Sequence, residues 1–188
     1  MLPTKHLLKC INSIYQMNKN IVTKDFKDNL TKTNTKKATF AAGCFWGIEA
    51  VFEQLKGVEK TTVGYTGGKL NNPTYEQVCT DKTGHAEAVE IIFDPKQITY
   101  EQLLETFWMI HDPTQKNKQG PDIGTQYRSE IFYHNQEQKQ IAEQSKKQKE
   151  KDLGMVIQTQ ITPAKEFYPA EEYHQKYFKK QGRTNCKI

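Results

Sequence analysis

The sequence predicts an α+β domain, a two-layer, plait-like α/β sandwich with a mixed sheet, helices packed against it and a flexible tail at each end. Two observations carry this prediction. Segments with strand-like alternation interleave with segments of helical periodicity, and no segment repeats. The 9 Phe, 9 Tyr and 2 Trp can build a core although only 36% of residues are hydrophobic.

The first half of the domain begins with a strand over 38–43. Helical spacing follows at 46–57, with Ile48, Val51, Phe52 and Leu55 on one face and Gly57 as a C-cap. Residues 57–68 are rich in strand formers, 71–79 hold at most one helical turn, and 86–95 alternate as a strand.

The second half opens with a helix over 99–112, where Thr99 and Gln102 have capping-box spacing. A long polar loop follows, then a strand over 125–135 and a charged helix ended by Gly154. Residues 155–163 alternate as a strand. The aromatic-rich segment 167–181 is predicted to be a helix entered at Pro169.

Charge divides the 188 residues into three parts. We expect residues 1–37 to form a basic, disordered tail or targeting segment, 38–180 the folded domain, and 181–188 a mobile end. Residues 1–38 carry a net charge of +6, whereas the whole chain carries +5. The remaining residues are therefore close to neutral. The charge distribution therefore does not indicate a phosphate-binding domain, and no nucleic-acid partner is expected.

Other classes are disfavoured by simple counts. No apolar run approaches the roughly 20 residues of a membrane helix, so no membrane partner is expected. Four scattered cysteines form no CxxC pair and no disulfide scaffold, so we expect no metal and a reducing compartment. We expect a cytoplasmic monomer; the alternative location is mitochondrial, if the basic segment is a transit peptide.

Cys44 is the first candidate for chemistry. It lies between Gly43 and Gly47 at a strand-to-helix turn, where the positive end of the helix can lower the pKa of a thiol. The alternative is a small buried hydrophobe. Phe45 and Trp46 follow directly, and because adjacent helical residues diverge, one or both can line a pocket beside the thiol.

Polar candidates lie further along the chain. Glu87 is expected to share a strand face with Val89 and Ile91, where loss of solvent would raise its pKa and make it a proton donor. Asp122 and Tyr127 are candidates for a polar wall, and Tyr75 for a hydroxyl donor. An exposed glutamate, a surface loop and a packed tyrosine are the respective alternatives.

The remaining cysteines differ in position. Cys186 lies on the C-terminal tail, where it can swing in to resolve an oxidised thiol, and Cys10 on the other tail is its rival. Cys79 is interpreted as packed.

Five stretches resemble the signature blocks of the peptide-methionine (S)-S-oxide reductases, the A-type methionine sulfoxide reductases, in that family's order. They cover about residues 38–180 and are GCFWG at 43–47, GGKLNNPTYEQVC at 67–79, TGHAEAVEIIFDP at 83–95, FWMIHDPTQKNKQGPDIGTQYRSEIF at 107–132 and FYPAEEYHQKYF at 167–178.

The resemblance implies a plait-like, cofactor-free reductase that turns methionine-S-sulfoxide in proteins back into methionine, with thioredoxin as external reductant. Cys44 would attack the sulfoxide sulfur and Glu87 would protonate its oxygen. Tyr75 and Tyr127 would bind that oxygen, with Asp122 orienting the wall. Phe45 and Trp46 would cradle the S-methyl group. The C-terminal end departs from some members, which leaves the resolving role of Cys186 open against Cys10 or an external thiol.

Two other functions compete with this one. A cysteine hydrolase or acyltransferase would pair Cys44 with His85, His111 or His174. A non-catalytic module would bind oxidised methionine without converting it.

Overall fold

The structure is a computed structural model, and it describes residues 35–183. Predictions for the two tails, including Cys10 and Cys186, therefore lie outside the described residues. The elements are, in chain order, β1 (Lys36–Ala42), α2 (Phe45–Phe52), β2 (Val58–Thr66), α3 (Tyr75–Cys79), β3 (Ala86–Phe93), α4 (Tyr100–Met109), β4 (Lys118–Gln119), β5 (Asp122–Ile123), the 3-10 helix η1 (Thr125–Tyr127), β6 (Ser129–Tyr133), α5 (Gln136–Leu153), β7 (Gln160–Pro163), β8 (Tyr168–Pro169) and α6 (Tyr177–Lys180).

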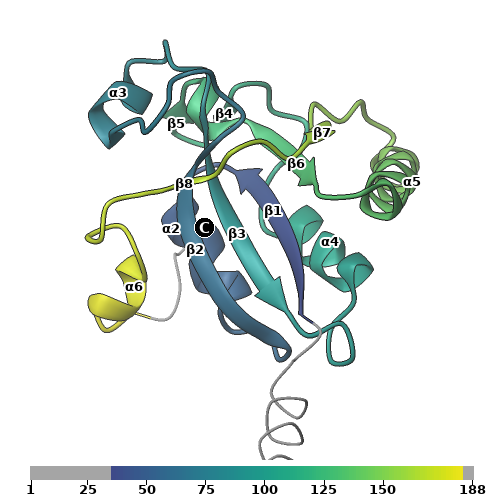
Figure 1. Ribbon diagram of the computed structural model, residues 1–188. Helices are drawn as coiled ribbons and strands as arrows, with labels where there is room; N and C mark the ends of the chain where they lie inside the picture. The colour runs from purple at the N-terminus through teal and green to yellow at the C-terminus, as the bar shows by residue number, and fades with distance from the viewer. Residues whose placement is uncertain (1–34, 184–188) are drawn as a thin grey trace, which may run out of the picture. The chain divides into compact units, whose positions relative to one another are not determined.

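One six-stranded sheet organises the domain, in the order β7-β6-β1-β3-β2-β8. Every neighbouring pair is antiparallel except β6 and β7, which are parallel, so the sheet is mixed as predicted. In the register, Phe40 of β1 pairs with Val89 on one side and Ile131 on the other. Strands β1 and β3 therefore form the centre of the sheet (Figure 1).

The main core lies between one face of this sheet and helices α2, α4 and α5. Alternate residues of β1, such as Phe40, and of β3, such as Val89 and Ile91, are buried there with Phe52 of α2 and Leu103 of α4. Helices α2 and α4 lie behind the central strands in Figure 1. This two-layer arrangement buries an apolar face on each element, which is the principal stabilising contribution.

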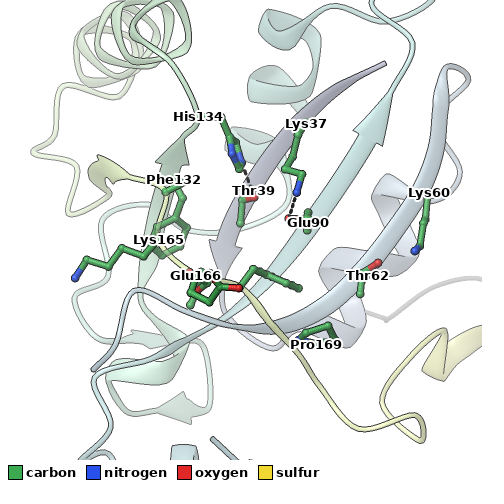
Figure 2. A pocket seen from close by; sticks show the side chains of 13 residues that line it. Lys37, Thr39, Lys60, Thr62, Glu90, Phe132, His134, Lys165, Glu166 and Pro169 are labelled. Carbon is green, nitrogen blue, oxygen red and sulfur yellow. Dashed lines mark hydrogen bonds and ion pairs between the residues drawn. The ribbon is translucent and has the colours of Figure 1, made fainter. Parts of the chain in front are cut away.

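The opposite face of the sheet carries a polar groove of about 410 Å³ (Figure 2). Its inner polar groups are already paired. Lys37 and Glu90 form an ion pair at 2.8 Å, and Thr39 and His134 are hydrogen-bonded at 2.9 Å. Neither Cys44 nor Glu87 lines this groove, so the chemistry predicted from the sequence lies on the helix-covered side.

Several elements differ from the sequence prediction. Helix α2 ends at Phe52, so Gly57, with φ +98°, belongs to the turn before β2 and not to a C-cap. The expected helix over 167–181 is a two-residue strand, turns and the short α6, because Lys176 adopts a left-handed φ of +54° that interrupts helical backbone. The polar loop contains the small β4–β5 ribbon.

Other predictions hold. The side chain of Thr99 accepts from the backbone of Gln102 and the Gln102 side chain accepts in return, which is the expected capping box at the start of α4. Among residues 35–183, no helix combines the length and apolar character needed to cross a membrane.

Candidate active site

Cys44 lies at the turn from β1 into α2 and is the N-cap residue of that helix. The preceding Gly43 has φ +92°, and a Cβ there would come within 2.7 Å of the Gln119 side chain, so only glycine allows the β4–β5 ribbon to approach this turn. The side chain of Cys44 is neither fully buried nor fully exposed. The turn therefore presents the thiol at the carboxyl end of a central strand.

The pKa of Cys44 corrects one sequence expectation. Backbone N–H groups of Trp46 and Gly47 do lower it, as the helix start predicts, but burial and the charge of Glu87 outweigh them. The result is a pKa raised to about 12. In the substrate-free protein the thiol is therefore protonated at neutral pH.

Glu87 faces the helix layer from β3, on the side of the sheet that carries Val89 and Ile91, as the alternation predicted. Only 2% of it is exposed, and its Oε2 accepts a hydrogen bond of 3.1 Å from the backbone N–H of Phe45. Burial raises its pKa to about 8, against the lowering effect of that hydrogen bond, and the nearby Asp122 raises it further. At neutral pH Glu87 is a neutral acid beside the Cys44 turn.

Asp122 and Tyr127 come from the long polar loop and reach the same place. The charge of Asp122 raises the pKa of Cys44 and of Glu87, which places the carboxylate within electrostatic range of both. Burial, followed by Glu87 and Asp122, raises the pKa of Tyr127 to about 12, so its hydroxyl is a donor. The turn that carries Tyr127 is held by Asp81, whose Oδ1 accepts from the backbone N–H of Thr125 at 2.8 Å.

Tyr75 starts the short helix α3, and Cys79 ends it. Burial and a hydrogen bond to Cys79 raise the pKa of Tyr75, with Glu87 and Tyr127 adding to the effect. The Tyr75 hydroxyl is therefore also a donor near the carboxyl. Cys79 itself is exposed, so the interpretation of it as a packed residue is wrong, since α3 turns its last residue toward solvent.

Phe45 and Trp46 do not point to separate places as expected, since their ring centroids lie 6.5 Å apart and both rings contact His174. Phe45 is 1% exposed and its ring lies 6.0 Å from Tyr65, whereas Trp46 is only partly buried. Trp46 stacks on Tyr177, with ring centroids 3.8 Å apart and planes 7° apart, and its indole N–H donates to Nδ1 of His174 at 3.0 Å. These contacts form an aromatic wall beside the thiol turn.

Sequence reasoning missed the residues behind this wall. His174 is 1% exposed and its ring contacts both Phe45 and Trp46. Glu171 accepts from the Tyr65 hydroxyl and from the backbone N–H of Tyr75, both at 2.9 Å. The many aromatic residues of 167–178 were a signal that this segment contributes to the site. Because a regular helix was expected there, the side chains that meet could not be identified.

The three histidines of the competing hydrolase are engaged elsewhere. His85 accepts from the backbone N–H of Gly68 and its other ring nitrogen lies 2.8 Å from the carbonyl of Leu70. His111 contacts the carbonyl of Phe107 and the hydroxyl of Ser129, and burial lowers its pKa to about 4. His174 is occupied by the Trp46 indole. Within residues 35–183 no hydrogen bond joins a histidine to Cys44, so these three residues are not arranged as a base for acyl transfer.

The described part of the chain also holds no cluster of three or more His, Cys, Asp or Glu side chains suited to a metal ion.

Comparison with known proteins identifies the family of this chain. The family model "peptide methionine sulfoxide reductase" matches residues 36–188. A peptide methionine sulfoxide reductase MsrA from Methanosarcina acetivorans is 63% identical over 150 residues, covering 78% of this chain and 79% of the relative. One from Acidobacterium capsulatum is 58% identical over 154 residues, covering 81% and 99%.

Solved structures show the same fold. Mxr1 from Saccharomyces cerevisiae in reduced form matches with a TM-score of 0.76 at 37% identity, covering 81% of this chain and 91% of that one. Mxr1 in complex with Trx2 matches with a TM-score of 0.56 at 30% identity, covering 76% and 84%. The fold and the site define a thiol-dependent oxidoreductase. The chain belongs to the peptide methionine sulfoxide reductase family.

Proposed function

We propose that the chain reduces the S epimer of methionine sulfoxide, in proteins and peptides, to methionine. The observation that carries this proposal is the pairing of Cys44 with a protonated, buried Glu87 across the N–H of Phe45. A sulfoxide sulfur is a weak electrophile until its oxygen gains a proton, so a thiol and an acid must act on the same group. Family membership supports the same reaction.

The protons and electrons of this step balance within the site. Glu87 donates its proton to the sulfoxide oxygen while the sulfur of Cys44 bonds to the sulfoxide sulfur. The hydroxyl formed in this way then passes to the Cys44 sulfur: its bond to the sulfoxide sulfur breaks as its bond to the Cys44 sulfur forms. The bond between the two sulfurs breaks at the same time, so methionine leaves and Cys44 is left as a sulfenic acid. The proton that Cys44 gives up returns to the Glu87 carboxylate. The Cys44 thiol supplies the two electrons that reduce the sulfoxide, so the proposed step requires no bound cofactor.

Epimer choice follows from the two kinds of wall. We assign the hydroxyls of Tyr75 and Tyr127 as donors to the sulfoxide oxygen, and Asp122 as the residue that orients this polar side. Phe45 and Trp46 form an apolar side for the methyl group. Because the oxygen and the methyl differ mainly in polarity, exchanging them in the R epimer would put each against the wrong wall.

Recycling needs a second thiol to condense with the sulfenic acid and a reductant to reopen the disulfide. We assign these roles to Cys186 and thioredoxin. The tail position of Cys186 supports the first, and the solved complex of Mxr1 with Trx2 supports the second. Cys10 remains the rival resolver.

The test uses a peptide with the S-sulfoxide and no added reductant. We expect about one equivalent of methionine per reduced enzyme, with none from Cys44→Ser and the wild-type amount from Cys79→Ser. A disulfide map after this turnover is expected to join Cys44 to Cys186. Full conversion by Cys44→Ser, or a thioester on Cys44 in place of an oxidised sulfur, would overturn the proposal.

A further inference from the structure

Glu49 is a buried carboxylate that the proposed chemistry does not use. It lies one turn after Trp46 on α2 and is only 1% exposed. Burying a carboxylate is costly unless it is paired and hydrogen-bonded, so its partners indicate what it is for.

Those partners are Thr61 of β2 and Lys176, which lies in the segment behind the aromatic wall. Oε2 of Glu49 accepts from the backbone N–H of Lys176 at 2.8 Å, and Oε1 accepts from Thr61 at 3.1 Å. The ammonium group of Lys176 lies 3.5 Å from Oε1 and also donates to the Thr61 hydroxyl. Both ends of Lys176, backbone and side chain, are therefore held by this one carboxylate.

Lys176 is also the point where the wall segment turns. Its φ of +54° is a left-handed conformation that is unfavourable for a residue with a Cβ. The turn separates His174, which accepts from the Trp46 indole, from Tyr177, which stacks on the same indole. An extended or helical residue at 176 would move one of these two away from Trp46.

We propose that Glu49 is a positioning residue which, by holding Lys176 in this turn, keeps both supports of Trp46 in place and so sets the affinity of the substrate-binding wall. The inference rests on the proposed function, because the wall is assigned to the methyl group of the sulfoxide. Glu49 acts through Lys176 and does not touch the reacting atoms. Its hydrogen bonds go to Lys176 and Thr61, and none joins it to Cys44 or Glu87 among the residues that the structure describes.

The kinetic test is single turnover with the S-sulfoxide peptide over a range of concentrations. For Glu49→Ala we expect the half-saturating concentration to rise about tenfold and the limiting rate to stay within about threefold, because binding is weakened and chemistry is not. For the isosteric Glu49→Gln, which keeps an acceptor oxygen, we expect a rise of about threefold. The matched control is Glu53→Gln, which removes a more exposed partner of Lys176 at 3.5 Å and should leave both parameters unchanged.

A spectroscopic arm needs no turnover. The chain has two tryptophans, so all variants are made in a Trp108→Phe background, where emission reports Trp46 alone. We expect acrylamide to quench Trp46 more strongly in Glu49→Ala, by an intermediate amount in Glu49→Gln, and as in the parent in Glu53→Gln. Thermal melts confirm that each variant is folded.

The outcomes separate the two proposals. A folded Glu49→Ala with unchanged half-saturation and unchanged quenching overturns the positioning role, as does a loss confined to the limiting rate. If Glu49→Ala does not fold, parent-like behaviour of Glu49→Gln in both arms overturns it. If the parent itself forms no methionine, the proposed function fails, while the quenching comparison still decides whether Glu49 holds Trp46.

Discussion

The backbone N–H of Phe45 donates to Oε2 of Glu87 across 3.1 Å, and this bond ties the residue after Cys44 to the centre of the sheet. It joins the start of α2 to β3 in a place from which water is excluded. The carboxyl therefore gains one hydrogen bond yet keeps a pKa raised by burial. The bond holds the Glu87 carboxyl against the backbone of the residue that follows Cys44.

Replacement of this acid tests its role directly. Glu87→Gln keeps the shape and an acceptor for the Phe45 N–H but cannot donate an acidic proton. We expect methionine formation in a single turnover to slow by about 10²–10⁴-fold, the usual contribution of a positioned acid. Rapid-quench measurement of methionine checks this. Glu90→Gln, on the opposite face of the sheet, is the control, and an unchanged rate in Glu87→Gln would remove the acid role.

The raised pKa of Glu87 also makes stability depend on pH. Its folded pKa of about 8 lies above the ordinary 4.5, so between these values the folded state holds a proton that the unfolded state has released. Its contribution to the free energy of unfolding is thus complete below about pH 4.5 and is lost as pH rises through about 8. We expect urea unfolding between pH 5 and pH 9 to show the wild type losing free energy of unfolding relative to Glu87→Gln as the pH rises. A pH-independent difference would contradict this.

Glu87 should also control the reactivity of Cys44. After burial, the charge of Glu87 is the next largest cause of the high pKa of Cys44. In Glu87→Gln we expect iodoacetamide to alkylate Cys44 faster than in wild type at pH 9, where Glu87 is ionised. At pH 6, where Glu87 is neutral, the two proteins should differ less. Peptide mass spectrometry distinguishes Cys44 from the exposed Cys79, and equal rates at pH 9 would show that the two groups do not interact.

Tyr127 provides a test of the polar wall. Its hydroxyl is a donor in the range of Glu87 and Asp122, and loss of one such donor in a site of this kind costs about 10²-fold in rate. We expect that loss in the single-turnover rate of Tyr127→Phe. Tyr133→Phe, at the end of β6, serves as control. A Tyr127→Phe rate equal to that of the control would assign the sulfoxide oxygen to other donors.

A buried ion pair stabilises the loop that carries Tyr127. Arg128 and Glu130 lie 2.6 Å apart with side chains 11% and 4% exposed, and Thr162 donates to Glu130 at 2.7 Å. Glu130→Gln leaves the guanidinium without its countercharge, so we expect the free energy of unfolding to fall by about 3–5 kcal/mol. Breaking the exposed Lys36–Glu137 pair by Glu137→Gln should cost at most about 1 kcal/mol. Chemical denaturation measures both, and similar losses would contradict the burial argument.

Local patterns in the sequence predicted much of the fold and several site residues. The features that they did not predict depend on contacts between residues far apart in the sequence. Alternation placed Glu87 on the core side of β3 because a strand has period two, and capping chemistry placed the start of α4. The pKa of Cys44 was expected to fall because only its own helix was visible in the sequence. Burial and the charge of Glu87, 43 positions away, reverse the sign.

The same reason explains the aromatic segment. Its composition favoured a helix, but Glu49, 127 positions earlier, holds Lys176 in a conformation that ends one. Cys79 was judged from its neighbours in sequence, whereas its exposure depends on how α3 sits beside Tyr75. The resolving roles of Cys186 and Cys10 stay predictions.

The stacking of Trp46 on Tyr177 joins residues from opposite ends of the domain, and it has a consequence for protein synthesis. A nascent chain that already carries the thiol, the acid, both phenols and Trp46 still lacks the ring on which Trp46 stacks until Tyr177 has left the ribosome. Contacts of such long sequence separation form late and are lost entirely on premature termination. Translation products that end before Tyr177 would thus contain Cys44, Glu87 and both tyrosines, and yet bind their substrate weakly.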